Sequence, residues 1–257
     1  MSWNVSSTLP RAEALLEPPV RSLVSRRRQL ATVQMALYAL TALPEGDLVE
    51  TGVFHGGTTV LMARVLRDTS SARTLWACDS FEGLPRTQRE DLGGNCSSLP
   101  GHAAPADDDD ESDALPVPRR SCGRGRPGQY RSPRTTVEQA LRTERLFKHV
   151  RIVPGWFHES LPPAGLRSIG FLRLDGDTYN GTFEALRRLY PLVLPGGVVY
   201  VDDAGSFRGA ALALRDYFGR PIGTPIRESE GFFDAVWWVK NASLRAPDVH
   251  GAAVVRA

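Results

Sequence analysis

Two pairs of aspartates stand where their carboxylates could act together. Asp175 and Asp177 follow the apolar run IGFLRL, and Asp202 and Asp203 follow the apolar run VVYV. Short apolar runs bounded by glycine and proline are typical of buried strands. Carboxylates that converge repel one another unless a cation lies among them, and Mg²⁺ is a hard cation that takes oxygen ligands. The two pairs therefore predict a magnesium site.

The segment between the two pairs explains how they could meet. Residues 178–194 carry apolar side chains at helical spacing, which makes the order strand, helix, strand. Such a crossover makes the two strands parallel neighbours, and both pairs then lie at the carboxyl edge of the sheet, where α/β sheets bind ligands. Either pair alone would more often be a turn or a helix cap. The two pairs together, at matched strand ends, favour the metal site.

Upstream of these pairs, a glycine-rich turn predicts a nucleoside site. Residues 48–51 are typical of a strand, residues 52–58 (GVFHGGT) of a tight turn and residues 59–67 of a helix. This order forms the element that binds an adenosine-containing cofactor, because glycine lets the cofactor approach the backbone. The spacing G-x-x-x-G-G departs from the G-x-G-x-x-G of dinucleotide enzymes, which weakens an NAD interpretation.

A carboxylate at the end of the next strand fits the same cofactor. Asp79 follows the apolar run LWAC (75–78), at a position where a carboxylate accepts hydrogen bonds from ribose hydroxyls. Phe81 could stack on an adenine. The structural alternatives are a helix-cap role for Asp79 and a core position for Phe81.

The remaining patterns complete an α/β fold. Apolar spacing predicts helices over residues 21–43, 135–147 and 207–217, a strand over 150–153 and two strands within 225–239. We therefore expect a Rossmann-like, doubly wound, mostly parallel sheet of seven strands with a C-terminal antiparallel hairpin.

The first of these helices has an arginine run beside its apolar stripe. The stripe consists of Leu23, Leu30, Val33, Leu37 and Leu40. The arginines at 26–28 stand on the other side of the helix, so we interpret them as a solvated face, with steering of an anion as the alternative.

Residues 86–134 differ in composition from the rest of the chain. They hold an acidic block followed by a basic block, and their apolar residues are too sparse to offset the entropy of ordering. We interpret this segment as an inserted, largely disordered loop within a single domain of residues 1–257. That domain would also have an N-terminal extension and helix (1–29) and a tail (241–257).

Bulk composition limits the partners and the location. The chain has 257 residues, is 42% hydrophobic and carries a formal net charge of +2, which fits one α/β domain and disfavours a nucleic-acid partner. The three cysteines lack metal-ligand spacing, which fits a reducing compartment. No secretory pattern occurs in residues 1–19, and no stretch approaches the roughly 20 apolar residues of a membrane span. We expect a cytoplasmic protein without a membrane partner, compatible with a homo-oligomer.

Five motifs in order resemble one enzyme family. They are VETGVFHGG (49–57), DSFEGLP (79–85), PGWF (154–157), LRLDGDTY (172–179) and PGGVVYVDD (195–203). From about residue 30 to residue 240, apart from the loop, the chain resembles the macrocin O-methyltransferase (TylF-type) family. The resemblance implies a class I methyltransferase that depends on S-adenosylmethionine and Mg²⁺ and methylates hydroxyls, notably on the sugars of natural products.

The resemblance also implies roles for individual residues. It assigns cofactor binding to Glu50, Thr51, Gly52, Thr58, Asp79, Ser80 and Phe81. It assigns metal binding to Asp175, Asp202 and Asp203, and leaves Asp177 as a general base or a further ligand. Two features depart from the family pattern: His55 stands where an arginine is common, and the loop is unusually long where the family places a substrate-covering segment.

The expected reaction is transfer of a methyl group to a hydroxyl of a sugar or another small natural product. A hydroxyl is a poor nucleophile at neutral pH, so a bound Mg²⁺ would lower its pKa and Asp177 would take its proton. His158, which follows the third strand at the same edge, is the alternative base. The competing hypotheses are an NAD(P)-dependent oxidoreductase and a non-catalytic binding domain that keeps the methyltransferase fold.

Overall fold

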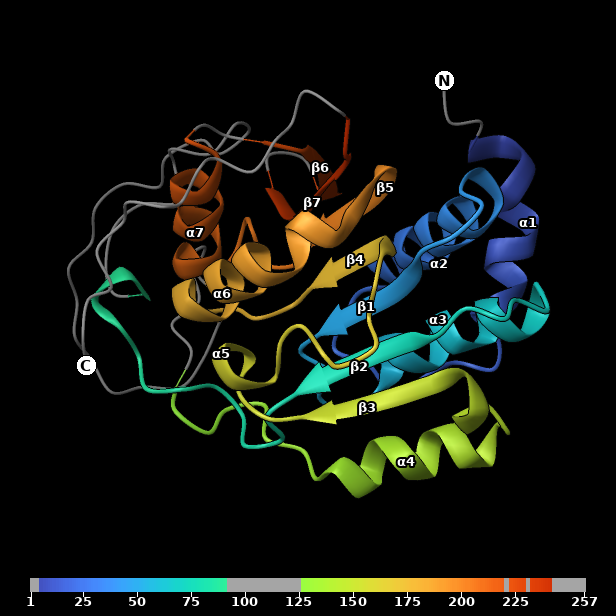
Figure 1. The fold of residues 1–257 in the computed structure, drawn as a ribbon, viewed down its shortest axis with the longest axis horizontal. Helices are drawn as coiled ribbons and strands as arrows, with labels where there is room; N and C mark the ends of the chain where they lie inside the picture. Colours follow the sequence, from blue (N-terminus) through green and yellow to red (C-terminus); the bar gives the residue numbers. More distant parts are fainter. Residues whose placement is uncertain (1–4, 92–125, 220–221, 230–231, 242–257) are drawn as a thin grey trace.

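A seven-stranded sheet lies at the centre of the computed structural model (Figure 1), which describes residues 5–91, 126–219, 222–229 and 232–241. The strands are β1 (Asp47–Thr51), β2 (Leu75–Asp79), β3 (Val150–Pro154), β4 (Ile169–Leu174), β5 (Val193–Val201), β6 (Thr224–Ser229) and β7 (Phe232–Val239). Their order is β3-β2-β1-β4-β5-β7-β6, with β1 to β5 parallel and β7 antiparallel to both neighbours. The predicted fold class and the C-terminal hairpin are thereby confirmed.

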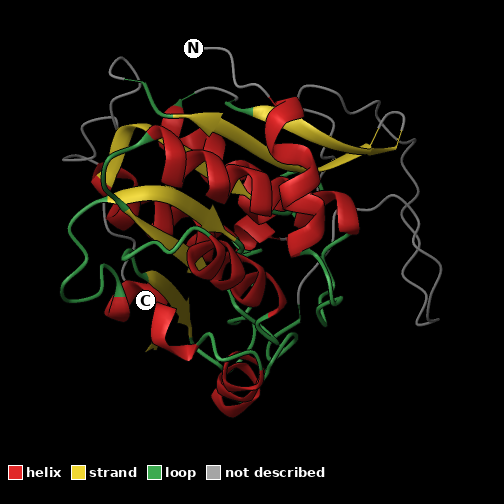
Figure 2. Ribbon diagram, turned by 90° about the vertical axis from the view of Figure 1, so that its right-hand side faces the viewer, coloured by secondary structure: helices red, strands yellow, loops and turns green. Residues whose placement is uncertain are grey.

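Helices cover both faces of this sheet (Figure 2). The α-helices are α1 (Val5–Leu15), α2 (Arg26–Ala42), α3 (Gly57–Asp68), α4 (Arg134–Thr143), α5 (Phe157–Ser160), α6 (Tyr179–Leu189) and α7 (Arg208–Phe218). The short 3₁₀ helices are η1 (Arg89–Asp91), η3 (Phe147–His149) and η4 (Tyr190–Leu192). The first four α-helices share one core cluster with the sheet, and α6 and α7 share another on the opposite face.

Successive residues along a strand point to opposite faces of the sheet and therefore pack in different core clusters. Leu48 packs on the side of α2 and α3, and its neighbour Val49 packs on the side of α6. Tyr200 and Val201 divide in the same way. Since both faces are covered, the strands are apolar on both sides, which is why they appear in the sequence as continuous apolar runs.

The predicted crossover between the aspartate pairs is present. Strand β4 leads through α6 to β5, its parallel neighbour, and Leu174 is in register with Val201. The residues after these two positions therefore leave the sheet at the same edge. In Figure 1 the arrowheads of the parallel strands all point to that side.

Helix α2 begins later than predicted. Ser25 is its N-cap, and the Ser25 hydroxyl accepts a hydrogen bond from the Arg28 backbone N–H at 3.2 Å. Leu23 therefore precedes the helix and is 68% exposed, so its assignment to the apolar stripe was wrong. The other members of the stripe are buried or packed against the core.

The predicted inserted loop is described only at its two ends. Residues 92–125 lie outside the described part of the chain, as do the acidic block and residues 242–257 of the predicted tail. The ends pair with each other: the Leu84 backbone N–H donates to the Gln129 carbonyl at 2.8 Å, and the Gly128 N–H donates to the Leu84 carbonyl at 2.9 Å. Asp91 and Ser132 are buried. Within the described residues, no helix is both long enough and apolar enough to cross a membrane.

Gly52 joins the glycine-rich turn to the strand that carries the first aspartate pair. Its φ is +80°, and a Cβ built on it would lie 1.7 Å from the backbone oxygen of Asp175. We expect Gly52→Ala to lower the unfolding free energy by more than about 3 kcal/mol, from left-handed strain and overpacking together. Urea unfolding would measure this.

The matched control is Gly219→Ala at the C-cap of α7. Gly219 has a φ of +67°, but an added Cβ would meet no described atom within 4 Å. This variant should lose only the roughly 1–2 kcal/mol of left-handed strain. Equal losses in the two variants would show that the close approach of Gly52 to Asp175 does not matter.

Candidate active site

A large cavity opens at the carboxyl edge of the sheet. Its volume is about 1440 Å³, and its walls come from the glycine-rich turn, the end of β2, the loops after β4 and β5, and helices α5 and α6. Pockets for one small ligand are typically about 300–1,000 Å³. This cavity therefore has room for two ligands side by side.

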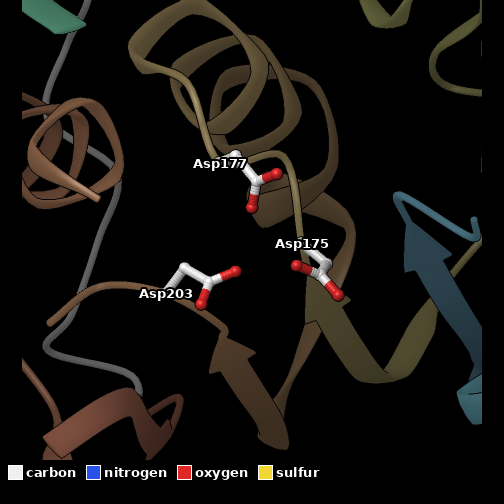
Figure 3. A group of neighbouring side chains, drawn as sticks. All are labelled: Asp175, Asp177 and Asp203. Atoms are coloured by element: carbon white, nitrogen blue, oxygen red, sulfur yellow. The ribbon is translucent and has the colours of Figure 1, made fainter. Parts of the chain in front are cut away.

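Three carboxylates meet on one wall of the cavity. Asp175, Asp177 and Asp203 each offer an oxygen, and these oxygens lie within 4.8 Å of one another. Figure 3 shows the three side chains turned toward a common point, two from the loop after β4 and one from the loop after β5. An all-oxygen set of this size fits a hard divalent cation such as Mg²⁺.

Asp202 lies outside this trio because two arginines hold it. Its Oδ1 accepts a hydrogen bond from Arg28 Nη1 at 2.7 Å, and its Oδ2 accepts one from Arg173 Nη2 at 2.5 Å. The Asp202 side chain is only 1% exposed. Of the residues predicted as metal ligands, the structure thus brings Asp175 and Asp203 together and adds Asp177 in place of Asp202.

Arg28 corrects the interpretation of the arginine run. It is buried, and its guanidinium reaches Asp203 at 3.5 Å and Asp234 of β7 at 3.0 Å, in addition to Asp202. The prediction of a solvated face therefore holds for the exposed Arg26 and Arg27 but is wrong for Arg28. Helical spacing could have revealed this. Arg28 shares a helix face with residues 32, 35 and 39, all of which are buried.

Arg173 was not predicted as a functional residue, although it stands inside an apolar strand. Its side chain is fully buried in β4 and contacts three carboxylates: Asp202, Asp175 at 2.7 Å and Glu50 at 3.4 Å. A buried guanidinium requires acidic partners. An arginine within the run IGFLRL was therefore a signal for this network.

Burial and mutual repulsion change the pKa values of the trio. Burial, together with Asp175, raises the pKa of Asp177 to about 8. Burial and the neighbouring aspartates also hold the pKa of Asp203 well above its usual range, and burial raises the pKa of Asp175 despite Arg173. The raised pKa values of these neighbouring carboxyls favour protons in the metal-free site, which a bound cation would replace.

The pKa of Asp202 changes in the opposite direction. Burial alone would raise it, but Arg173 and Arg28 outweigh burial and lower the pKa of this carboxyl. Asp202 is therefore an ionised anchor for both arginines, whereas Asp175 and Asp203 each contact one of them and Asp177 contacts neither. The opposite pKa shifts therefore indicate two roles: Asp202 binds the arginines, and the trio is available to bind a cation.

Backbone strain is concentrated around the cavity. Asp177 and Asp203 have φ values of 53° and 54°, in the left-handed region that costs non-glycine residues about 1–3 kcal/mol. Phe54, Phe81 and Tyr130, in the turns around the cavity, also have positive φ. Strain of this kind persists only where the surrounding contacts determine the conformation, and it is typical of functional sites.

The residues assigned to the cofactor divide into two groups. Gly52, Thr58, Asp79 and Ser80 line the cavity. The other three, Glu50, Thr51 and Phe81, do not line it, and Glu50 and Thr51 are fully buried behind the turn.

Glu50 acts as a buried brace for the glycine-rich turn. Its carboxylate accepts hydrogen bonds from the hydroxyls of Thr58, at 2.5 Å, and Thr59. Burial raises its pKa to about 7, against the opposing effect of Arg173 and the two threonines. Glu50 thus links the start of α3 to β4 without facing the cavity.

Asp79 holds the glycine-rich turn from the opposite side. Its Oδ2 accepts the backbone N–H groups of Val53 at 2.6 Å and Phe54 at 3.2 Å, and its Oδ1 accepts the N–H of Phe81 at 2.6 Å. The carboxylate still borders the cavity. A carboxylate has about four acceptor positions, so hydrogen bonds to a ligand remain possible.

Aromatic residues form part of the lining of the cavity. They are Phe54, Tyr130, Trp156, Phe157, Tyr179, Phe183 and Phe207. Tyr130, which sequence reasoning did not single out, packs edge-on against Phe54 with ring centroids 5.8 Å apart. His158 also borders the cavity, but its side chain is 61% exposed and lies 3.4 Å from Glu159.

Comparison with known proteins identifies relatives of this chain. The family model described as Macrocin-O-methyltransferase (TylF) matches residues 7–99 and 126–240. A tetracenomycin-C rhamnosyl 4'-O-methyltransferase of Streptomyces olivaceus is 35% identical over 202 residues, covering 77% of this chain and 67% of the relative. The demethyldecarbamoylnovobiocin O-methyltransferase of Streptomyces niveus is 34% identical over 160 residues, covering 62% of this chain and about half, 52%, of that protein.

A solved structure shares the fold. The O-methyltransferase NovP superposes with a TM-score of 0.65 at 28% identity, covering 86% of this chain and 82% of that one.

Asp177 should make the metal-free protein less stable as the pH rises. Its pKa is about 8 in the folded chain against an ordinary value of 3.8, so between these values the folded chain keeps a proton that the unfolded chain releases. The stability from this proton is complete below about pH 4 and is lost as the pH rises through about 8. Urea unfolding in EDTA should show this decline, and Asp177→Asn should show a shallower one.

Added Mg²⁺ provides a second check on this pH dependence. A cation binds ionised carboxylates, so it should stabilise the wild type more at about pH 8 than at about pH 5. Identical pH profiles for wild type and Asp177→Asn would contradict the proton assignment.

Arg28→Met should destabilise the fold strongly, because it leaves Asp202 and Asp234 without this cation. Removing one partner of a buried ion pair costs about 3–5 kcal/mol. The control is Arg26→Met in the same helical turn, where the arginine pairs with Glu17 at 3.0 Å and both side chains are more than half exposed. Its unfolding free energy should stay within about 0.5 kcal/mol of wild type. Equal effects in the two variants would refute a special role for Arg28.

Proposed function

This chain belongs to the macrocin O-methyltransferase (TylF) family and is an S-adenosylmethionine-dependent O-methyltransferase, and from that premise we propose that it methylates a sugar hydroxyl of a glycosylated natural product with the help of a divalent cation. The observation that carries this proposal is the trio of carboxylates beside the glycine-rich turn, in one cavity. Family membership sets aside the oxidoreductase hypothesis.

The methyl donor would occupy the half of the cavity bordered by the glycine-rich turn. Gly52 and Thr58 border it at the turn, and Asp79 and Ser80 border it at the end of β2. Asp79 keeps acceptor capacity for the ribose hydroxyls, and Gly52 leaves room for close approach to the backbone. S-adenosylmethionine, when bound, supplies the methyl group on a positively charged sulfur. Glu50 supports the turn from behind.

The acceptor would occupy the part of the cavity bordered by the trio and by aromatic side chains. Trp156, Phe157 and Phe183 offer apolar faces, and Glu184 and Arg187 offer polar groups beside them. Apolar faces with a few polar groups are typical of sites that bind and orient small molecules. The relative from Streptomyces olivaceus is named for methylation of a rhamnosyl group, which supports a deoxysugar acceptor here.

Asp175 and Asp203 would hold the cation in this proposal. Mg²⁺ in proteins is usually bound through one or two carboxylates, with waters and substrate oxygens completing its coordination. When bound, the cation would lower the pKa of an acceptor hydroxyl and orient it. Asp202 has the anchor role instead, because it lies outside the trio and each of its two oxygens accepts a hydrogen bond from a different arginine.

Asp177 would take the proton from the acceptor hydroxyl. It lies within the same trio. Its pKa is about 8 in the metal-free site, and a bound cation would lower it, so that the carboxylate is ionised and can accept a proton. Its left-handed backbone turns the side chain toward Asp203 and Asp175, as Figure 3 shows. His158 is a weaker candidate, since its side chain is mostly exposed.

A direct test is methyl transfer from labelled S-adenosylmethionine to a panel of aryl rhamnosides, assayed with Mg²⁺ and with EDTA. We expect turnover of glycosides, none of the matching aglycones, and loss of turnover in EDTA. Methylation of the aglycones alone would refute the sugar acceptor. Undiminished turnover in EDTA would refute the cation.

Substitution of neighbouring aspartates separates the ligand role from the anchor role. Asp203→Asn should weaken Mg²⁺ binding, measured by calorimetry, by about 100-fold or more, with little loss of stability because it relieves repulsion. Asp202→Asn should lower the unfolding free energy by about 3–5 kcal/mol, because it weakens a buried ion pair, and should change Mg²⁺ affinity far less. A stable Asp202→Asn protein that no longer binds Mg²⁺ would restore the ligand set implied by the sequence.

A further inference from the structure

Asp91 is a buried carboxylate that none of the roles above uses. It ends η1, at the first described edge of the inserted segment, and is 7% exposed. Its Oδ1 accepts the backbone N–H of Tyr179 at 2.7 Å, and its Oδ2 accepts the N–H of Gln88 at 3.0 Å. Asp91 therefore binds the first residue of α6, a favourable position for a negative charge at a helix N-terminus.

The start of α7 packs against the same carboxylate. Gly209 lies in its first turn, and a Cβ built there would be 2.0 Å from Asp91 Oδ1 and 2.4 Å from the Tyr179 nitrogen. Helix η1 also packs on α7. The absence of a side chain at Gly209 is thus what lets η1, α6 and α7 meet at one point.

Helices α6 and α7 each follow one of the loops that carry the trio. Tyr179 comes two residues after Asp177, so its N–H fixes the far end of the first loop. In the second loop, the N–H groups of Ser206 and Phe207 donate to the Asp203 carbonyl at 3.0 and 2.8 Å. Gly209 follows two residues later.

Backbone strain in two residues of the trio makes their positions depend on contacts at this junction. Asp177 and Asp203 both have left-handed backbone conformations, which persist only when neighbouring contacts hold them. The Ser206 hydroxyl, just before α7, also donates to Asp203 Oδ1 at 2.9 Å. Movement of either helix start would therefore change the spacing between the two carboxylates.

We propose that Asp91 is a positioning residue for the active site: by joining the starts of α6 and α7, it holds the two aspartate-bearing loops at the spacing that their chemistry needs. The proposal rests on the proposed function, in which Asp177 and Asp203 act on the acceptor hydroxyl. It assigns a role in building the site to the described start of the inserted segment, residues 86–91. A positioning error of about 1 Å in such a site can cost about 100-fold in rate.

Three variants test the proposal against a purely local cap. Asp91→Ala removes both acceptors, and Gly209→Ala leaves Asp91 in the chain but forces it away from Tyr179. Asp91→Asn keeps one carbonyl acceptor for the Tyr179 N–H. The control is Arg89→Ala, an exposed position in the same short helix that does not border the cavity.

Hydrogen exchange supplies a readout that does not depend on metal or turnover. In Asp91→Ala and Gly209→Ala, we expect faster exchange at Tyr179 and also at Ser206 and Phe207, in the other loop. Mn²⁺ affinity, measured by electron paramagnetic resonance, should weaken by about 10- to 100-fold, as is typical when groups that support metal ligands are lost. The kcat should fall by a similar factor, with the KM for S-adenosylmethionine within about twofold.

The outcomes separate this proposal from the proposed function. Near-normal kcat and Mn²⁺ affinity in Asp91→Asn, with losses in both alanine variants and none in Arg89→Ala, would support a positioning role. Faster exchange confined to Tyr179, with unchanged kcat and Mn²⁺ affinity, would overturn it and leave Asp91 as a helix cap. If the wild type shows no response to Mn²⁺ at all, the proposed cation fails, and exchange at Ser206 and Phe207 still decides whether Asp91 joins the loops.

Discussion

Buried negative charge in excess of positive charge, at one edge of the sheet, is the constraint on which this structure depends. Arg28 and Arg173 are placed among the carboxylates of Glu50, Asp175, Asp202, Asp203 and Asp234, with Asp177 beside them. Both guanidiniums contact Asp202 and lower its pKa, whereas burial outweighs the weaker compensation at Asp175, Asp177 and Asp203 and raises their pKa values. An uncompensated buried charge costs several kcal/mol, so these neighbours must hold protons or a cation. The excess of buried negative charge that destabilises the metal-free fold is therefore also what would attract a cation to this edge of the sheet.

The charge network also connects the two halves of the cavity. Arg173 contacts Glu50, which braces the glycine-rich turn, and Asp175, which belongs to the trio. Gly52 brings the backbone of that turn against the backbone of Asp175. A donor held by the turn and an acceptor held by the trio would therefore share one rigid wall. Such preorganisation can supply a large part of the rate of a two-substrate transfer.

Much of the site could be predicted from sequence because its signals are local. Asp79, Asp175 and Asp203 each follow a short apolar strand, and parallel strands bring their ends to one edge. The choice between Asp177 and Asp202 could not be predicted, since it depends on backbone turns after the strands and on two arginines from distant parts of the chain. Arg28 was misjudged because an arginine run is usually solvated; its helical position indicates burial, but its acidic partners, Asp202 after β5 and Asp234 in β7, are distant in sequence.

The sequence by itself determined the order of the elements, the fold class and the gathering of acids at one sheet edge. Apolar periodicity and glycine placement predict individual helices, strands and turns from a few residues each. The rule for parallel crossovers then predicts how the strands are arranged in the sheet. Only the tertiary structure decided which carboxylates face the cavity, which are neutralised by arginine, and that Asp91 meets the starts of α6 and α7. Those outcomes depend on distances between segments far apart in the chain, and electrostatic energy depends on such distances and on burial rather than on spacing along the sequence.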